Sequence, residues 1–254
     1  MKPSSGILKP LQIWKAILLF AGTSIAIYIG LYTVLPVLQS KGLTFLSCYL
    51  ICFYTTFSIM FLLAFVFYWS EGNDLTLDAF KYRYRLEQVN QRTWLWAFGL
   101  FAFGIVTMFG FSFIGKLLAS IPLLTPPGYF PSEINPLKAA IPNTFMGTEV
   151  HGQWGYAIGY FVGWFFNIFG EELLWRGYML PRQQLQYGKW TWIIHGLLWT
   201  GWHFFWKWNL LSILPIALAI PFVAQKTRNS WIGIIAHGLL NLIPFVALVY
   251  FILN

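Results

Sequence analysis

Long stretches of apolar residues, separated by short polar connections, dominate this chain. A helix needs about 20 residues to cross a bilayer, so apolar runs of about 18 or more predict transmembrane helices. Such runs cover residues 13–38, 43–69, 94–118, 156–170, 190–206, 210–224 and 231–253. The run at 156–170 continues as a more polar stretch to residue 186. The pattern predicts an all-α bundle of about seven or eight spans, forming one integral membrane domain over residues 1–254.

Two connections are long enough to hold structure outside the lipid. Residues 70–93 mix apolar and basic side chains, which favours a helix lying among the lipid headgroups, with a plain solvated linker as the alternative. Residues 120–154 contain six prolines between Pro122 and Pro142, and these exclude one continuous helix. An irregular loop is the first expectation there, and a cap over the bundle is the alternative.

Composition supports the membrane assignment. Hydrophobic residues make up 58% of the chain and charged residues 9%, and the mean hydropathy is +0.63. These values exclude a water-soluble domain. The formal charge of +8 comes from dispersed basic residues with no continuous basic groove, so we expect no nucleic-acid partner.

The basic residues instead predict the topology. With the N-terminus in the cytoplasm, the outer segments hold only Lys41, Lys138 and Lys207. The inner segments then hold Lys2, Lys9, Lys15, Lys81, Arg83, Arg85, Arg92, Arg182, Lys189, Lys226 and Arg228. This asymmetry is what the positive-inside rule requires. We therefore predict a multi-pass protein of the plasma membrane with a cytoplasmic N-terminus and an outer C-terminus.

The two cysteines do not indicate a metal or redox site. Cys48 and Cys52 lie four residues apart inside one predicted span, where thiols usually pack as small apolar groups and where no zinc-binding spacing includes them. We expect no cofactor.

Few ionisable residues fall within the predicted spans, apart from lysines near span ends. Each costs on the order of 3 kcal/mol at bilayer depth, so such groups are kept where they are paired or used. The set consists of Glu171, Glu172, Arg176, His195, His203 and His237.

Two adjacent acids in this set have different expected roles. Glu172 and Arg176 are four residues apart in the favourable order for a helical ion pair, so Glu172 is expected to be neutralised locally. Glu171 projects about 100° away from Glu172 around the helix axis and lies off that pair. It is a candidate general base that takes a proton from water. A structural carboxylate bonded to another helix is the alternative.

Further polar groups lie on later spans. His237 and Asn241 are four residues apart on one helical face and can donate hydrogen bonds to one developing oxyanion, or can simply bond spans together. His203 is a candidate partner of Glu171 in orienting water, and a packing histidine is the alternative. His195 lies about 80° away from His203 on the helical wheel, so it is left out of the candidate site.

Together, Glu171-Glu172-x-x-x-Arg176, Trp199-x-x-x-His203 and His237-x-x-x-Asn241 resemble the three-motif signature of the CAAX prenyl-protease and bacteriocin-processing family of intramembrane glutamic endopeptidases. The motifs fall within residues 155–245, the expected catalytic region. The second motif of the family usually begins with Phe, and Trp199 keeps the aromatic character.

The resemblance implies a role for each residue. Glu171 would activate water with His203, His237 and Asn241 would stabilise the oxyanion, and Glu172 and Arg176 would support the site. It also implies a helical bundle with a catalytic cavity inside the membrane. The expected partners are a peptide or lipidated-peptide substrate and membrane lipid.

Three other functions stay open at this point. Zinc held by Glu171, His203 and His237 uses allowed ligand types but lacks a tight His-x-x-x-His spacing. A non-catalytic membrane protein, such as a bacteriocin self-immunity factor, would use the polar cluster only to hold its spans together. A transporter with Glu171 as a proton relay predicts an internal symmetry that the sequence does not show.

Overall fold

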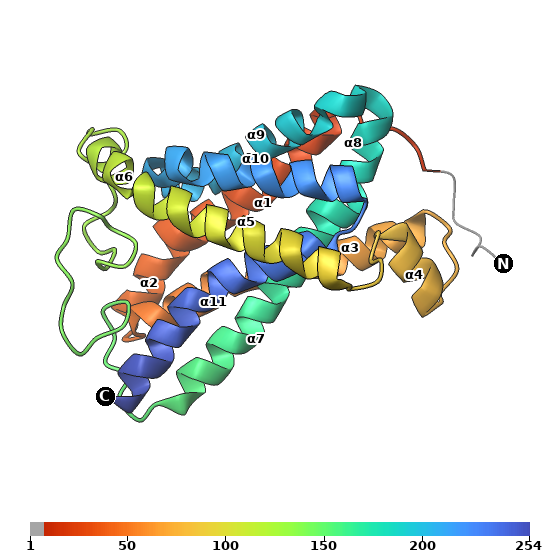
Figure 1. The fold of residues 1–254 in the computed structure, drawn as a ribbon. Helices are drawn as coiled ribbons and strands as arrows, with labels where there is room; N and C mark the ends of the chain where they lie inside the picture. The colour runs from red at the N-terminus through yellow and green to blue at the C-terminus, as the bar shows by residue number, and fades with distance from the viewer. Residues whose placement is uncertain (1–7) are drawn as a thin grey trace.

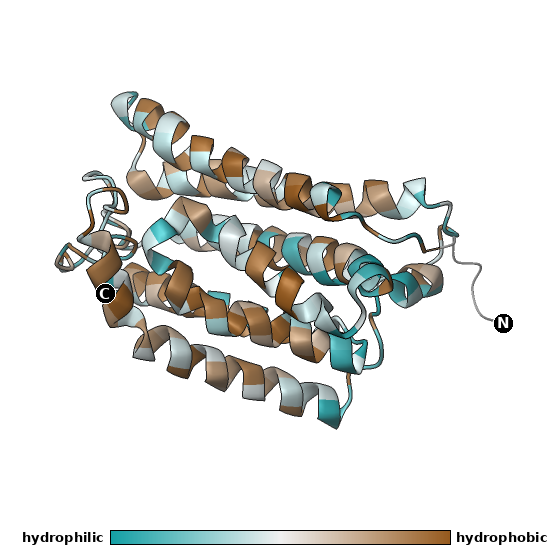
Figure 2. Cartoon of the chain, turned by 90° about the horizontal axis from the view of Figure 1, so that it is seen from above, coloured by the Kyte–Doolittle hydropathy of each residue, from teal (hydrophilic) through white to brown (hydrophobic). Residues whose placement is uncertain are grey.

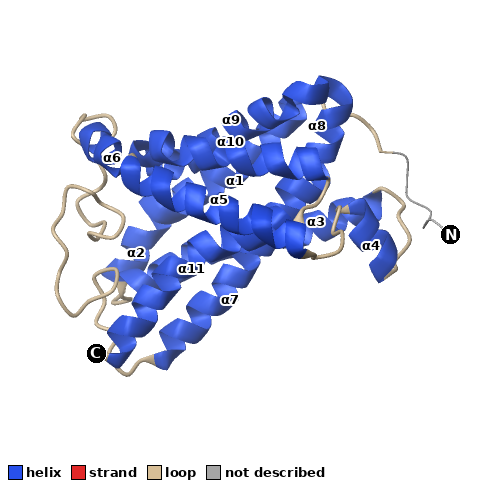
Figure 3. Cartoon of the chain, in the orientation of Figure 1, coloured by secondary structure: helices blue, strands red, loops and turns tan. Residues whose placement is uncertain are grey.

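The computed structural model describes residues 8–254, and Lys2 of the predicted inner segment lies outside this range. Residues 8–254 fold into helices and loops without a strand, apart from one isolated bridge between Phe145 and Thr148 (Figure 3). The predicted all-α class is confirmed.

Several predicted runs are divided where the helix changes its winding. The π-helices η1 and η2 and the 3₁₀ segments η3 and η4 interrupt the α-helices. The elements are α1 (Ile13–Ile29), η1 (Gly30–Val34), α2 (Leu35–Ser40), α3 (Phe45–Ser70), α4 (Leu77–Arg83), α5 (Gln91–Gly110), α6 (Ser112–Ala119), α7 (Trp154–Glu171), η2 (Glu172–Met179), α8 (Leu180–Tyr187), η3 (Gly188–Trp190), α9 (Thr191–Trp202), η4 (His203–Asn209), α10 (Leu210–Thr227) and α11 (Trp231–Leu253).

The outer surface of the bundle is apolar. Leu62, Leu95, Val106 and Ile158 are each more than 60% exposed, and hydrophobic residues cover most of the helix lengths (Figure 2). Five helical stretches in residues 8–254 are long and apolar enough to cross a membrane. The chain is an integral membrane protein, because water would not tolerate this surface.

The exact number of spans stays a prediction. One of the five stretches, Trp154–Thr227, is a continuous helical run of 74 residues. It contains three of the apolar runs in the sequence, those at residues 156–170, 190–206 and 210–224.

The two long connections gather at opposite ends of the bundle. Figure 1 shows α6, the loop that follows it and the C-terminus at one end, and α4 and α8 at the other. Residues 70–93 do contain a helix, α4, which begins where the Thr76 side chain accepts a hydrogen bond from the Ala79 backbone N–H. Residues 120–153 form the expected irregular loop.

Glycines bring α7 close to α3. A Cβ atom on Gly163 would overlap the Tyr54 ring, and one on Gly170 would lie 2.7 Å from the Phe57 carbonyl oxygen. The two glycines are seven residues apart and therefore share one helical face. This close packing fixes α7 immediately before Glu171.

Candidate active site in the helix bundle

The two adjacent acids lie where α7 changes into a π-helix. α7 ends at Glu171, and η2 begins at Glu172. Short π-helical segments inside α-helices occur often at functional sites. The two carboxylates contact different partners.

Glu171 is bonded to two neutral donors. The Asn167 side-chain amide donates to Oε1 at 3.0 Å, and the Trp199 indole N–H donates to Oε2 at 2.8 Å. The residue is only 2% exposed. None of the ion pairs in residues 8–254 involves Glu171, so it lies off the Glu172–Arg176 pair as predicted.

Glu172 is fully buried and contacts two nitrogen-bearing side chains. Its Oε1 lies 3.3 Å from Arg176 Nη1 and 3.0 Å from His237 Nδ1. The Arg176 guanidinium also lies 3.6 Å from the centre of the Trp199 ring. A buried arginine is thereby held between a carboxylate and an aromatic face.

A glycine on α11 makes room for the second oxygen of Glu172. A Cβ atom on Gly233 would lie 2.3 Å from Glu172 Oε2. Within residues 8–254 this oxygen has no hydrogen-bond partner. A larger residue at position 233 would therefore force the Glu172 carboxylate to shift.

A chain of hydrogen bonds joins the two acids. Asn241 Nδ2 lies 2.7 Å from Asn167 Oδ1 and 3.0 Å from His237 Nε2. His237 Nδ1 contacts Glu172, and Asn167 Nδ2 contacts Glu171. Four side chains from α7, η2 and α11 thus connect through Asn241.

The carboxylates of Glu171 and Glu172 at the two ends determine which atoms donate along this chain of hydrogen bonds. Because the Glu171 carboxylate only accepts, Asn167 turns its NH₂ group to Glu171 and its oxygen to Asn241. Asn241 must then donate both to Asn167 and to His237 Nε2. The His237 hydrogen accordingly lies on Nδ1 and points to Glu172.

His203 presents an unprotonated nitrogen. Its Nδ1 lies 2.9 Å from the Trp199 carbonyl oxygen, which only accepts, so the ring hydrogen lies on Nδ1. Nε2 then carries a lone pair. In residues 8–254 there is no direct hydrogen bond between His203 and Glu171, although both line the same cavity.

The position of His203 depends on a break in the helix. α9 ends at Trp202, and η4 starts at His203 and contains non-helical backbone at Trp206, with φ −122° and ψ 56°. One straight span would have placed His203 near the membrane surface. The run at residues 190–206, which the apolar pattern predicted as one span, is therefore not one regular α-helix.

A cavity of about 520 Å³ joins these groups. Asn167, Glu171, His203, His237 and Asn241 line it. Glu172 and Arg176 are buried and are not among the lining residues, so they lie behind the others.

The loop after α6 closes part of the cavity. Glu133, Ile134, Phe145 and Met146 contribute to its lining, and the Met146 backbone N–H donates to Glu133 Oε1 at 2.6 Å. This irregular loop therefore also has the capping position that was the alternative expectation.

His195 and the two cysteines, which were not expected at the site, lie outside the cavity. His195 is fully buried and contacts Gln183 through Nδ1 at 2.6 Å. Cys48 and Cys52 are free and buried. Residues 8–254 contain no group of three His, Cys, Asp or Glu side chains placed to hold a metal ion.

Two residues of the site escaped the sequence reasoning. Asn167 lies four positions before Glu171, so its amide inside an apolar run was the available signal. Trp199 was treated only as an aromatic member of its motif, but its N–H contacts Glu171 and its ring face contacts Arg176. Both functions depend on side-chain orientation, which spacing does not give.

Comparison with known proteins supports the expected family. Residues 153–243 match the family model described as type II CAAX prenyl endopeptidase Rce1-like. No curated protein and no solved structure matches the chain. Residues 153–243, the segment that holds all six predicted site residues, are therefore similar to the Rce1-like family of type II CAAX prenyl endopeptidases.

Proposed function

We propose that the protein is an intramembrane endopeptidase that hydrolyses a peptide bond with a water molecule activated by Glu171. The observation that carries this proposal is a buried carboxylate lining the same cavity as His203, His237 and Asn241. The substrate is a peptide at the membrane, with or without a lipid group. The family match over residues 153–243 supports this chemistry.

In the proposed reaction, water binds between Glu171 and Nε2 of His203. Glu171 takes a proton while the water oxygen attacks the carbonyl carbon of the peptide bond. The same proton is then delivered to the leaving nitrogen as the C–N bond breaks, which releases an amine and a carboxyl product that keeps the water oxygen. The hydrogen bonds from Asn167 and Trp199 hold the carboxylate in position for both transfers.

His237 and Asn241 are proposed to stabilise the tetrahedral oxyanion. In the resting structure one Asn241 hydrogen bond goes to His237 Nε2. The substrate oxygen would replace this nitrogen as the acceptor. The contact of His237 Nδ1 with Glu172 holds the imidazole ring beside the Asn241 amide.

A structural role for the cluster is the second candidate. It is favoured by one observation: both nitrogen contacts of Asn241 are already made within the protein. In that case the cluster serves only to hold α7 and α11 together, as in a non-catalytic immunity protein.

Replacing Glu171 with Gln distinguishes the peptidase function from the structural role of the cluster. We expect Glu171→Gln to lower the turnover of a peptide substrate by at least about a hundredfold, because an amide cannot take the proton from water. Purified protein in detergent would be assayed with a library of prenylated and unprenylated peptides.

Glu149→Gln is the matched control, because Glu149 is an exposed carboxylate on the loop after α6 and does not line the cavity. It should cleave like the unaltered protein. Thermal unfolding of each variant would check folding, and His203→Gln provides a second test if Glu171→Gln does not fold. Unchanged turnover in a folded Glu171→Gln protein would leave the structural role as the explanation.

A further inference from the structure

The first helix of the chain is bonded to the residue directly before His203. The Ser24 hydroxyl of α1 donates to the Trp202 carbonyl oxygen at 2.6 Å, and these two residues are 178 positions apart in the sequence. The Trp202 indole N–H donates to Thr23 Oγ1 at 2.9 Å. Two adjacent side chains of α1 therefore hold both the backbone and the ring of Trp202.

A third contact holds the residue two positions after His203. Tyr32 belongs to η1, the π-helical segment that continues α1, and its hydroxyl donates to the Phe205 carbonyl oxygen at 3.1 Å. The last carbonyl groups of a helix have no partner within that helix, so donors from elsewhere can satisfy them. The contacts of Ser24 and Tyr32 therefore stabilise the break between α9 and η4 on both sides of His203.

The two anchored residues also pack against the His203 ring. The Trp202 ring meets the imidazole edge-on with 4.8 Å between ring centroids, and the Phe205 ring lies at 5.8 Å. Both aromatic residues are buried. Because protein interiors are close-packed, a shift of either aromatic residue would turn or move the imidazole. The contacts made by α1 and η1 therefore act on the position of Nε2 of His203 in the cavity.

The α1 hydroxyl groups are polar exceptions in a largely apolar helix. Thr23 and Ser24 are 8% and 7% exposed, and buried polar groups are kept where they have hydrogen-bond partners. The Thr23 hydroxyl donates to the Leu19 carbonyl oxygen at 2.8 Å, so a lone pair of the same oxygen accepts the Trp202 N–H. These residues lie outside residues 153–243, the segment that the family model matches.

We propose that Thr23, Ser24 and Tyr32 are positioning residues for His203. They hold the helix break so that Nε2 of His203 faces the water proposed to lie between this nitrogen and Glu171. None of the three lines the cavity, so they act through the residues next to His203 and not on the substrate. The proposal rests on the proposed peptidase function, but one of its tests needs no catalysis.

Ser24→Ala tests the hydrogen bond to the break by kinetics. We expect kcat to fall about tenfold with little change in KM, because a small displacement of a catalytic group slows the reaction without removing substrate contacts. Ser58→Ala is the matched control, since the Ser58 hydroxyl donates to the Tyr54 carbonyl oxygen within α3 at 3.0 Å. Thr23→Ser keeps the hydroxyl and should cleave like the unaltered protein, whereas Thr23→Val should resemble Ser24→Ala. An unchanged kcat in Ser24→Ala would overturn the proposal.

Combining Ser24→Ala with His203→Gln separates positioning from a general effect on the fold. If Ser24 acts through His203, the double variant cleaves no more slowly than His203→Gln alone, because the effects of residues that share one partner do not add. A further loss of the same size as in Ser24→Ala would overturn the proposal. Thermal unfolding would check each variant, and Tyr32→Phe takes the place of Ser24→Ala if that variant does not fold.

Chemical modification tests the position of His203 without catalysis. Diethyl pyrocarbonate reacts with unprotonated imidazole nitrogen, and mass spectrometry would follow its reaction at His203 relative to His151, which is exposed on the loop after α6. We expect the relative rate at His203 to rise at least about threefold in Ser24→Ala, and not in Ser58→Ala, because a loosened break exposes the ring more often. An unchanged rate would overturn the proposal.

The two kinds of measurement also separate this proposal from the peptidase function. If the unaltered protein cleaves no peptide while the modification rate rises as expected, the peptidase function fails and the positioning of His203 by α1 stands. If peptide cleavage depends on Glu171 but neither kcat nor the modification rate responds to Ser24→Ala, the positioning role fails and the peptidase function stands.

Discussion

At the scale of single residues, Trp199 joins the two halves of the site. Its indole N–H donates to Glu171, and its ring face lies on Arg176, which is paired with Glu172. The related motif usually has Phe here, which would keep the ring contact but has no N–H. This chain therefore holds its proposed base with one more hydrogen bond than such a Phe residue would provide.

Trp199→Phe isolates that hydrogen bond. We expect kcat to fall about tenfold to a hundredfold with little change in KM, because a hydrogen bond to a charged group contributes about 1.5–3 kcal/mol. Steady-state kinetics on a cleaved library peptide would measure both constants. Trp192→Phe is the control, since Trp192 lies on the same helix outside the cavity. A rise in KM alone would show that Trp199 acts in substrate binding instead.

At the scale of the elements, the contact of η2 with α11 depends on the absence of a side chain at one position. Gly233 faces Oε2 of Glu172. The other carboxylate oxygen of Glu172, Oε1, contacts His237, which lies on α11 like Gly233. The position of α11 thus sets the distance between Glu172 and His237. Any side chain at Gly233 must push the carboxylate or the helix away.

Gly233→Ala should therefore reduce both turnover and stability. We expect a loss of about 1–3 kcal/mol in unfolding free energy, the usual cost of overpacking, together with reduced peptide cleavage. Gly99→Ala on α5 is the control, because its Cβ would meet no atom within 4 Å and alanine is the better helix former. Denaturant unfolding in detergent would compare the two. Equal stability of the variants would contradict this account of the contact.

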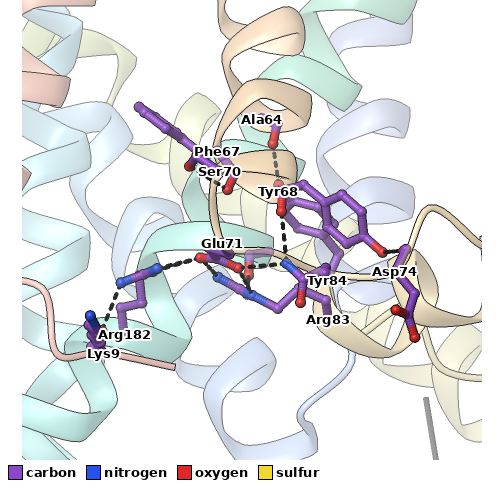
Figure 4. Close-up of polar contacts among 12 residues, drawn as sticks. Lys9, Ala64, Phe67, Tyr68, Ser70, Glu71, Asp74, Arg83, Tyr84 and Arg182 are labelled. Carbon is purple, nitrogen blue, oxygen red and sulfur yellow. Dashed lines mark hydrogen bonds and ion pairs between the residues drawn. The ribbon is translucent and has the colours of Figure 1, made fainter. Parts of the chain in front are cut away.

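At the scale of the whole molecule, a charged cluster ties segments that are distant in the sequence (Figure 4). Glu71, at the end of α3, accepts from Arg83 Nε at 2.5 Å and from Arg182 Nε at 3.0 Å. Arg182 also donates to the Lys9 carbonyl oxygen at 2.9 Å. The cluster therefore joins α3, α4, α8 and the segment before α1.

The pKa of Glu71 makes this cluster sensitive to pH. Burial by itself would raise the pKa, but the hydrogen bonds and charge of Arg83 and the hydrogen bond of Arg182 lower it below its ordinary value. A lowered folded-state pKa stabilises the fold above the unfolded-state pKa of about 4.3, and this stabilisation is lost as the pH falls through the folded-state pKa.

Acidification should thus remove the difference in thermal stability between the unaltered protein and the Glu71→Gln variant. We expect the variant to be less stable at pH 7 and the two unfolding midpoints to converge below about pH 4. Thermal unfolding in detergent from pH 7 to pH 3 would measure this, with exposed Glu87→Gln as the control. A gap between the midpoints that stays constant with pH would show that Glu71 does not act through its charge.

The sequence by itself determined the helical membrane class, the separation of Glu171 from the Glu172–Arg176 pair and the family motifs. These follow from apolar run lengths and from spacings within one helix, which are local properties. The tertiary structure alone decided the hydrogen-bond chain through Asn167 and Asn241, the N–H contact of Trp199 and the cap over the cavity. The reason is physical: these contacts depend on where separate helices break, tilt and approach at glycines, and no local pattern encodes that arrangement.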